Sequence, residues 1–198
     1  MGSSKGWTTL AERWFFALWP DEATRAALAA PLAGWLPKGA RPLDPRDLHL
    51  TLAFLGPVAP EVMPCIERIA TRIQAAPFAL RIDRIGHFRG ARVLWCGPTE
   101  TPPALETLVA DLRDGLATCG LALDPRPYRP HVTLARHVAV APRVSWPAAV
   151  TWRADAFVLA AGGGAPTGRR YRIARRWDLV THPSGPAMPT TPSPSSVA

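Results

Sequence analysis

The chain has 198 residues, 47% of them hydrophobic, and a formal net charge of +8 at pH 7. This length suits one domain with its own core, and a charged fraction of only 19% excludes a disordered polyelectrolyte. Only Lys5 and Lys38 are lysines, so arginine supplies nearly all of the 23 basic residues. The planar guanidinium matches phosphate with two hydrogen bonds, so the charge fits an anionic partner such as nucleic acid, although a GC-rich genome produces the same bias.

The N-terminal region and the cysteines bear on location. The apolar stretch 14–19 has six residues, fewer than the ~7–15 of a signal peptide or the ~20 of a membrane span. Cys65, Cys96 and Cys119 are odd in number, lie far apart and form no C-x-x-C pair. We therefore expect reduced cysteines, no disulfide framework, no zinc site and a cytoplasmic protein.

Hydrophobic periodicity predicts interleaved strands and helices. A strand over 12–19 precedes a helix over 21–36 that Pro31 interrupts. Alternation predicts a strand over 49–55, and apolar residues at helical spacing predict a helix over 61–76. The remaining predicted elements are strands over 78–85 and 93–96, a helix over 101–119 capped by Thr101, and strands over 131–135, 151–160 and 171–180.

Composition changes near the C-terminus. The glycine-rich segment 162–168 is predicted to be the tip of a long hairpin between the last two strands. From Pro183 onward the chain is rich in Pro, Ser and Thr, so we expect residues 183–198 to form a disordered tail. Residues 1–182 are then expected to form one domain, and their mixture of strands and helices indicates an α+β architecture.

The most informative feature is a repeated tetrapeptide. His49-Leu50-Thr51-Leu52 recurs as His131-Val132-Thr133-Leu134. Chance would produce two such tetrapeptides, each with apolar second and fourth positions, in only about 0.003 of chains with this composition. The repeat therefore indicates two related segments with a shared function.

The spacing of each motif places its polar side chains on one face of a strand. Because side chains alternate along a strand, His49 and Thr51 share one face, and His131 and Thr133 do likewise. If the two segments pack side by side, two imidazoles and two hydroxyls converge in one cleft. That set suits phosphoryl chemistry, because imidazole titrates near neutrality and can act as base or acid, while hydroxyls donate hydrogen bonds to phosphate oxygens.

At these residues the chain resembles the two-histidine (2H) phosphoesterase superfamily, in its RNA 2′,3′-cyclic phosphodiesterase (2′-5′ RNA ligase-like) branch. The likeness rests on residues 47–56, 128–136, 92–95 and the closing strand 171–179, and it extends over about residues 12–180. It implies a bilobal fold of two pseudo-twofold-related lobes, each an antiparallel sheet with helices outside and a central cleft between them. It also implies a hydrolase that converts RNA 2′,3′-cyclic phosphate ends to 2′-phosphomonoesters without metal or cofactor, with reversible 2′-5′ RNA ligation as a related activity.

The resemblance also assigns roles to individual residues. His49 corresponds to the general acid and His131 to the general base, while Thr51 and Thr133 correspond to phosphate ligands. Arg136, which follows the second motif, corresponds to a further phosphate ligand.

Candidate RNA contacts around the motifs are Phe88, Arg92, Tyr128 and Arg129. The Tyr128 ring suits base stacking, although capping of the core explains its position nearly as well. The expected partners are RNA ends such as those of tRNA fragments, or nucleoside 2′,3′-cyclic phosphates, bound by a monomer.

Three alternatives stay open at the level of sequence. A metal site is disfavoured because Thr is a poor ligand and no carboxylate or Cys stands at ligand spacing. A non-catalytic RNA-end-binding module and a phosphodiesterase for small cyclic phosphates, such as ADP-ribose 1″,2″-cyclic phosphate, remain as rivals. The arginines over 169–176 form either a solvated face or a track for an RNA backbone.

Overall fold

The structure is a computed structural model that describes residues 12–162 and 170–180. The predicted tail 183–198 and nearly all of the predicted hairpin tip lie outside the described residues. The strands are β1 (Arg13–Leu18), β2 (Arg41–Pro42), β3 (Leu50–Pro57), β4 (Phe78–Ile82), β5 (Arg84–Phe88), β6 (Val93–Gly97), β7 (Val132–Arg136), β8 (Val150–Ala154), β9 (Ala156–Gly162) and β10 (Tyr171–Asp178). The helices are α1 (Glu22–Ala29), α2 (Met63–Arg72) and α3 (Pro103–Ala117), with 3-10 turns at Ala30–Gly34, Pro45–Asp47 and Pro60–Val62.

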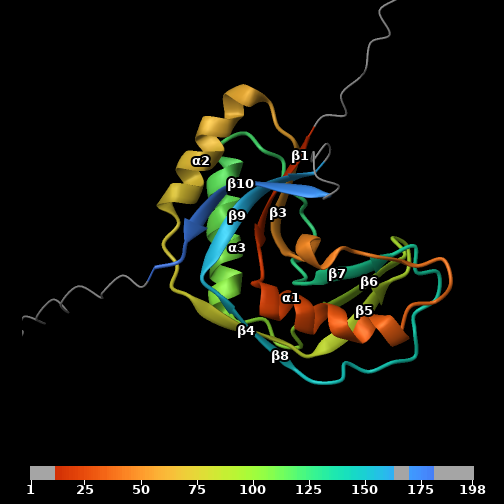
Figure 1. The fold of residues 1–198 in the computed structure, drawn as a ribbon. Coiled ribbons are helices and arrows are strands. Elements are labelled where there is room, and N and C mark those ends of the chain that lie inside the picture. The colour runs from red at the N-terminus through yellow and green to blue at the C-terminus, as the bar shows by residue number, and fades with distance from the viewer. Residues whose placement is uncertain (1–11, 163–169, 181–198) are drawn as a thin grey trace, which may run out of the picture.

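The main sheet consists of two antiparallel halves that meet at the repeated motifs (Figure 1). One half has the order β10-β9-β1-β3 and the other the order β7-β6-β5, with β2 beside β7. The halves join where β3 pairs with β7 through Leu50 and Val132. These are equivalent positions of the two motifs, so the pairing has the symmetry of a local twofold axis. The predicted α+β fold with two lobes of antiparallel sheet is confirmed.

Two predicted strands are each broken at an aspartate. The predicted strand 78–85 divides at Asp83, whose carboxylate accepts a hydrogen bond from the backbone N–H of Thr99 (2.7 Å). The predicted strand 151–160 divides at Asp155, whose carbonyl oxygen accepts from the N–H of Leu179 (2.7 Å). The outer pieces β4 and β8 pair with each other in a separate two-stranded sheet. Each chain segment therefore bends at its aspartate and links the two halves of the molecule.

The helices follow their sequence signals with shorter ends. Asp21 caps α1 by accepting from the N–H of Thr24 (2.7 Å), and a 3-10 turn replaces the helix at Pro31, as predicted. The predicted cap Thr101 is wrong, because α3 begins at Pro103 and no side chain caps it. Helices α2 and α3 lie together on one side of the sheet (Figure 1). No helix of the described residues combines the length and the apolarity that crossing a membrane requires.

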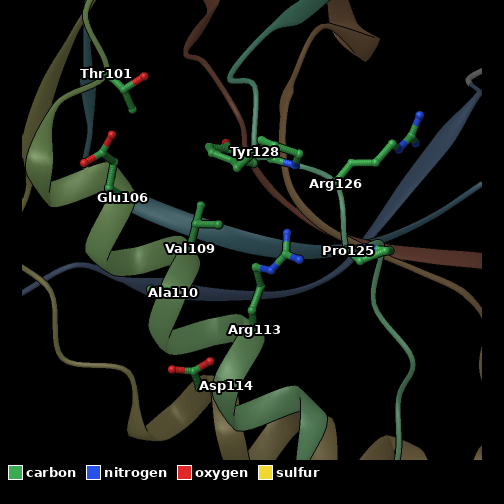
Figure 2. A pocket seen from close by; sticks show the side chains of 10 residues that line it. Thr101, Glu106, Val109, Ala110, Arg113, Asp114, Pro125, Arg126 and Tyr128 are labelled. Atoms are coloured by element: carbon green, nitrogen blue, oxygen red, sulfur yellow. The ribbon is translucent and has the colours of Figure 1, made fainter.

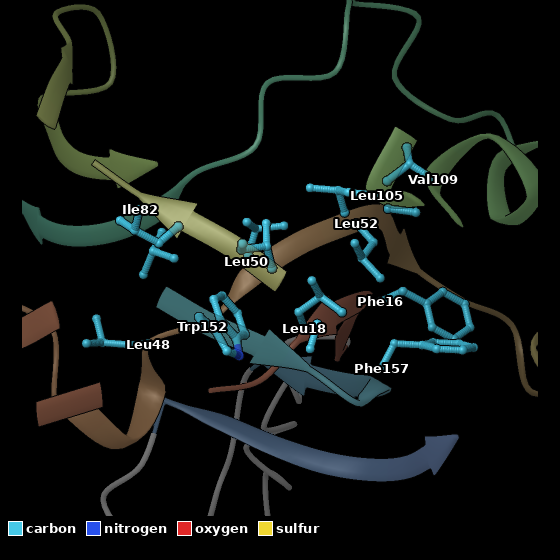
Figure 3. Close-up of a cluster of buried hydrophobic side chains, with 14 of the residues drawn as sticks. Phe16, Leu18, Leu48, Leu50, Leu52, Ile82, Leu105, Val109, Trp152 and Phe157 are labelled. Carbon is cyan, nitrogen blue, oxygen red and sulfur yellow. The ribbon is translucent and has the colours of Figure 1, made fainter. Parts of the chain in front are cut away.

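The apolar faces of the motif strands form the core. Leu50, Leu52, Val132 and Leu134 are at most 2% exposed, and Phe16, Leu18 and other large side chains cover them (Figure 3). Burial of each such side chain contributes about 1.5–3 kcal/mol. Because a shift by one residue would expose this whole row, the core fixes which face of each motif strand carries the histidine and the threonine.

The expectation of three reduced cysteines is wrong. Cys65 in α2 and Cys119, just beyond α3, form a disulfide with a Cα–Cα distance of 5.9 Å. The pairing depends on two helices that tertiary packing brings side by side, and a sequence separation of 54 residues carries no signal for it. Cys96 alone is free; it is buried in β6, and burial raises the pKa of its thiol.

Candidate active site

The two motif histidines lie immediately before β3 and β7, on either side of the pair that joins the half-sheets. The register of Leu50 with Val132 places His49 opposite Thr133 and Thr51 opposite His131. Directly opposed residues of antiparallel strands project from the same face. The structure therefore brings both imidazoles and both hydroxyls to one side of the sheet, opposite the core.

A cavity of about 670 Å³ opens on this side, and we call it the motif cavity. Of the residues singled out from the sequence, its lining includes Thr51, Phe88, Tyr128, Arg129, His131, Thr133 and Arg136. His49 does not line it but lies beside it, packed among the rings of Phe15 (4.9 Å between centroids), Trp19 (5.0 Å) and Tyr171 (4.9 Å).

Both histidines are held by the same local hydrogen bond. The Nδ1 of His49 lies 2.7 Å from the carbonyl oxygen of Asp47, and the Nδ1 of His131 lies 2.8 Å from the carbonyl oxygen of Arg129. Since a carbonyl only accepts, Nδ1 is the donor in each case. In the neutral ring the lone pair is then on Nε2, which fixes the nitrogen that exchanges a proton with a bound molecule.

The environment of both imidazoles favours their neutral forms. Burial lowers the pKa of His49 to about 4, against the opposing effect of its hydrogen bond to Asp47, and the charges of Arg136 and of a protonated His131 lower it further. Burial and the charge of Arg136 likewise lower the pKa of His131, against its bond to Arg129. The positive charge of Arg136, which lowers both pKa values, also attracts an anion.

Arg136 and Tyr128 complete the polar side of the cavity. Arg136 ends β7, and its Nε is buried without a hydrogen-bond partner among the described residues. Its charge lowers the pKa of both histidines. The hydroxyl of Tyr128 donates to the carbonyl oxygen of Thr51 (3.1 Å), and burial raises the pKa of Tyr128. Arg136 is therefore placed to bind an anion, and Tyr128 ties the 125–130 segment to the first motif.

Of the weaker candidates, the structure places Phe88 and Arg129 at the motif cavity but not Arg92. The Phe88 ring meets the His131 ring edge to face at 5.0 Å. Ala91 and Val93 line the cavity, whereas Arg92 between them is exposed and does not. Arg92 has a φ of +52°, and its carbonyl oxygen accepts from the N–H of Val138 (2.9 Å). This turn directs the arginine away from the site.

Phe54 is a lining residue that strand alternation does not predict. Along β3, Thr51 pairs with Ala17 and Phe54 pairs with Phe15. Two residues of β3, Leu52 and Ala53, therefore lie opposite the single residue Phe16 of β1. This β-bulge shifts the alternation and turns Phe54 to the face of Thr51. The ring lines the motif cavity and is 47% exposed, and the guanidinium of Arg13 stands 5.2 Å from its centroid.

Trp19 and Tyr171 also escaped prediction, because they reach His49 from separate segments of the chain. The Trp19 indole stacks on the His49 imidazole with an interplanar angle of 12°, and Tyr171 meets it edge to face. Their joint position depends on the strand order β10-β9-β1-β3, for which the sequence carries no local signal. Among the described residues, His, Cys, Asp and Glu form no group of three or more able to hold a metal ion.

The candidate RNA track along β10 is largely paired within the protein. Arg172 contacts Glu12 (2.9 Å), Arg175 contacts Glu67 (3.1 Å), and Arg176 contacts Asp178 (3.0 Å). Each pair is exposed, and such pairs contribute about 0–1 kcal/mol. The arrangement favours a solvated charged face over an open track for phosphates.

Known proteins share this sequence over most of its length. A sequence model of the 2′-5′ RNA ligase superfamily matches residues 20–162. The RNA 2′,3′-cyclic phosphodiesterase of Escherichia coli K12 is 34% identical over 175 residues, which cover 85% of this chain and 97% of that protein. The protein of the same name from Thermus thermophilus is 32% identical over 184 residues, which cover 84% of this chain and 90% of that protein.

The solved structures agree with the sequence comparison. The E. coli LigT complex with 3′-AMP has a TM-score of 0.74 at 32% identity and covers 86% of this chain and 99% of that one. A protein of T. thermophilus named TT0787 has a TM-score of 0.71 at 30% identity, with 86% and 100% covered. The family match spans well over half of the chain, and these relatives align over nearly their whole length. The chain therefore belongs to the 2′-5′ RNA ligase superfamily.

Proposed function

We propose that the protein hydrolyses the 2′,3′-cyclic phosphate ends of RNA to 2′-phosphomonoesters, by acid–base catalysis that requires no metal ion. The observation that carries the proposal is the pair of histidines, each held by Nδ1 to the carbonyl two residues earlier, on either side of the Leu50–Val132 pair. The names of the E. coli and T. thermophilus relatives support the choice of substrate. Binding of an anion alone does not require two proton-transfer groups, so the pair of histidines favours a catalytic site over a binding module.

In the proposed mechanism, Nε2 of His131 takes a proton from a water molecule as the water oxygen attacks phosphorus. The bond from phosphorus to O3′ breaks, and O3′ takes a proton from Nε2 of His49, so that a 2′-phosphomonoester and a free 3′-hydroxyl result. The hydroxyls of Thr51 and Thr133 and the guanidinium of Arg136 donate to the phosphate oxygens as negative charge develops. Each proton transfer of this kind accelerates a reaction by about 10²–10⁴-fold.

The acid role requires that His49 gain a proton when substrate binds. Its pKa is about 4, mainly because burial disfavours the charged ring. An anionic phosphate beside the ring raises this pKa, because it attracts the protonated imidazole. The low polarity of the surroundings strengthens the attraction between these two charges. We therefore propose that substrate binding itself raises the pKa of His49 and prepares the acid.

For the RNA chain, we propose contacts with Phe54, Phe88, Tyr128 and Arg129, all of which line the motif cavity. Stacking of a base on an aromatic ring contributes about 1–3 kcal/mol. Arg92 is not among the proposed RNA contacts, because it does not line the motif cavity.

The direct test is turnover of a nucleoside 2′,3′-cyclic phosphate and of a cyclic-ended oligonucleotide in excess EDTA. We expect hydrolysis of both to the 2′-phosphate, and loss of about 10²–10⁴-fold in kcat for His49→Ala or His131→Ala. His137→Asn is a matched control, since His137 is exposed, follows the second motif and has a φ of +59° that Asn tolerates. The absence of turnover of either substrate would sink the proposal.

A second substrate separates the two histidine roles. With a phosphodiester whose leaving group is p-nitrophenolate, the leaving oxygen needs no proton, so the variant that lacks the acid should regain most of its activity. Rescue of His49→Ala but not of His131→Ala supports the assignment, whereas the reverse pattern exchanges the two roles.

We further propose that residues 1–182 act as one monomeric domain in the cytoplasm, on RNA ends such as those of tRNA fragments. The net charge of +8 supports an RNA partner. The Cys65–Cys119 disulfide argues against the cytoplasm, because disulfides are rare in reducing compartments. Rapid alkylation of thiols in intact cells tests the location, because a cytoplasmic protein should be trapped with both cysteines reduced.

A further inference from the structure

A second cavity adjoins the motif cavity on the side of helix α3. It has a volume of about 500 Å³ and lies between α3 and the segment 125–128 (Figure 2), and we call it the α3 cavity. This volume is within the ~300–1,000 Å³ of typical ligand sites. The two cavities share Arg113, Arg126, Pro127 and Tyr128 in their linings, so they lie next to each other.

The shared wall is tied to the first motif. The Tyr128 hydroxyl donates to the carbonyl oxygen of Thr51 (3.1 Å), so the ring keeps a fixed position relative to the phosphate-facing strand. The same ring lines the α3 cavity, where its flat apolar surface is available to a base. Pro127, in both linings, adds an apolar edge beside it.

The side of the α3 cavity that adjoins the motif cavity carries two arginines. Arg113 donates to the carbonyl oxygen of Asp124, and Arg126 pairs with the carboxylate of Asp124. Both guanidinium charges act to lower the pKa of Asp124, to about 2, although the hydrogen bonds from Arg126 have the larger effect. Two cations around one carboxylate leave a net positive charge at the junction of the cavities.

Two carboxylates also line the α3 cavity. Glu106 and Asp114 line the α3 cavity but not the motif cavity, and both are exposed on α3. Carboxylates repel a phosphate but accept hydrogen bonds from the amino groups of bases. Asp114 directly follows Arg113, whereas Glu106 lies about two turns of α3 away, beside Thr101 (Figure 2). A nucleotide with its phosphate at Arg113 can therefore direct its base toward Glu106.

We propose that the α3 cavity binds the nucleotide that precedes the cyclic-phosphate nucleotide of an RNA end. The phosphodiester that joins the two nucleotides then lies against Arg113, and the preceding base stacks beside Tyr128. The inference rests on the proposed function and adds to it that the preferred substrate is an oligonucleotide of at least two nucleotides.

The test compares a nucleoside 2′,3′-cyclic phosphate with a dinucleotide that ends in the same cyclic nucleotide. The wild type should prefer the dinucleotide by about tenfold in kcat/KM, the effect of one stacked base. Ala110→Trp fills the α3 cavity from an exposed position of the helix and should remove this preference. Ala117→Trp, on an exposed alanine of the same helix that lines neither cavity, should keep the preference within about twofold.

A second variant and a binding measurement keep the test decisive. If Ala110→Trp fails to fold, Arg113→Met should instead reduce the ratio of kcat/KM values for the two substrates. If neither substrate is turned over, the proposed function fails, and calorimetric binding of the dinucleotide and mononucleotide 2′-phosphates decides the inference by itself. A wild type with no preference in turnover or binding, or a preference that survives Ala110→Trp, would overturn it.

Discussion

The partly buried histidine of the first motif makes the stability of the protein depend on pH. Burial lowers the pKa of His49 from an ordinary value of 6.5 to about 4 in the folded protein. A protonated unfolded chain is therefore favoured as the pH falls, because only the unfolded state takes up the proton readily between these values. The contribution to stability is fully present above about pH 6.5, is lost progressively as the pH falls toward 4, and stays lost below it.

The magnitude follows from the two pKa values. Between pH 7 and pH 5, His49 alone should lower the free energy of unfolding by about 2 kcal/mol, and the complete loss below pH 4 is about 3 kcal/mol. Carboxylates titrate in the same range, so the wild type must be compared with His49→Gln, which keeps a polar side chain but cannot take up the proton. The variant should lose about 2 kcal/mol less than the wild type between pH 7 and pH 5.

Urea unfolding followed by far-UV circular dichroism at pH 7, 6 and 5 measures this difference. Thr133→Val is the control, since it alters the same site but retains both imidazoles, and its pH dependence should match that of the wild type. Excess inorganic phosphate should reduce the difference between the wild type and His49→Gln, because a bound anion favours the protonated ring. Identical pH dependence of the wild type and His49→Gln would refute the conclusion that the folded protein keeps His49 neutral.

Three further changes probe the disulfide, the second motif and the bulge. Replacement of both Cys65 and Cys119 by Ser opens a loop with a sequence separation of 54 and should lower the free energy of unfolding by about 4 kcal/mol; equal urea midpoints with and without dithiothreitol would contradict this. A Cβ on Gly97 would stand 2.7 Å from the carbonyl oxygen of Pro130, directly before His131, so Gly97→Ala should cost about 1–3 kcal/mol of stability and about 10²-fold in kcat. Gly90→Ala, where the Cβ meets nothing within 4 Å, is the control, and equal kcat values in the two variants would refute the steric argument. Phe54→Leu should raise KM for a cyclic-ended RNA about tenfold with little change in kcat; an unchanged KM would show that the ring does not contact the base.

The sequence determines the faces of the motif strands because their period of two is a local property. Leu50 and Val132 point to the core in both copies, so the opposite face of each strand carries the histidine and the threonine. The sequence does not show which strands pair, and the junction of Leu50 with Val132 is a property of the folded sheet. The sequence therefore predicts that the two histidines converge only on the condition that the two motif segments pack side by side.

Several features that sequence reasoning missed interrupt regular periodicity. The bulge at Leu52 reverses the alternation and turns Phe54 into the motif cavity. Asp83 and Asp155 each end a strand that hydrophobic alternation alone continues, because their carboxylate or carbonyl groups bond to distant backbone N–H groups. These are long-range hydrogen bonds, and a window of neighbouring residues contains no information about them.

The repeat also shows how two identical motifs supply two different groups. Both histidines have the same bond from Nδ1 to the carbonyl two residues earlier, so the motif fixes the tautomer in each copy. Their surroundings come from parts of the chain that do not repeat: His49 packs among Phe15, Trp19 and Tyr171, whereas His131 lines the cavity. The difference between the two imidazoles therefore originates in the strands around the motifs.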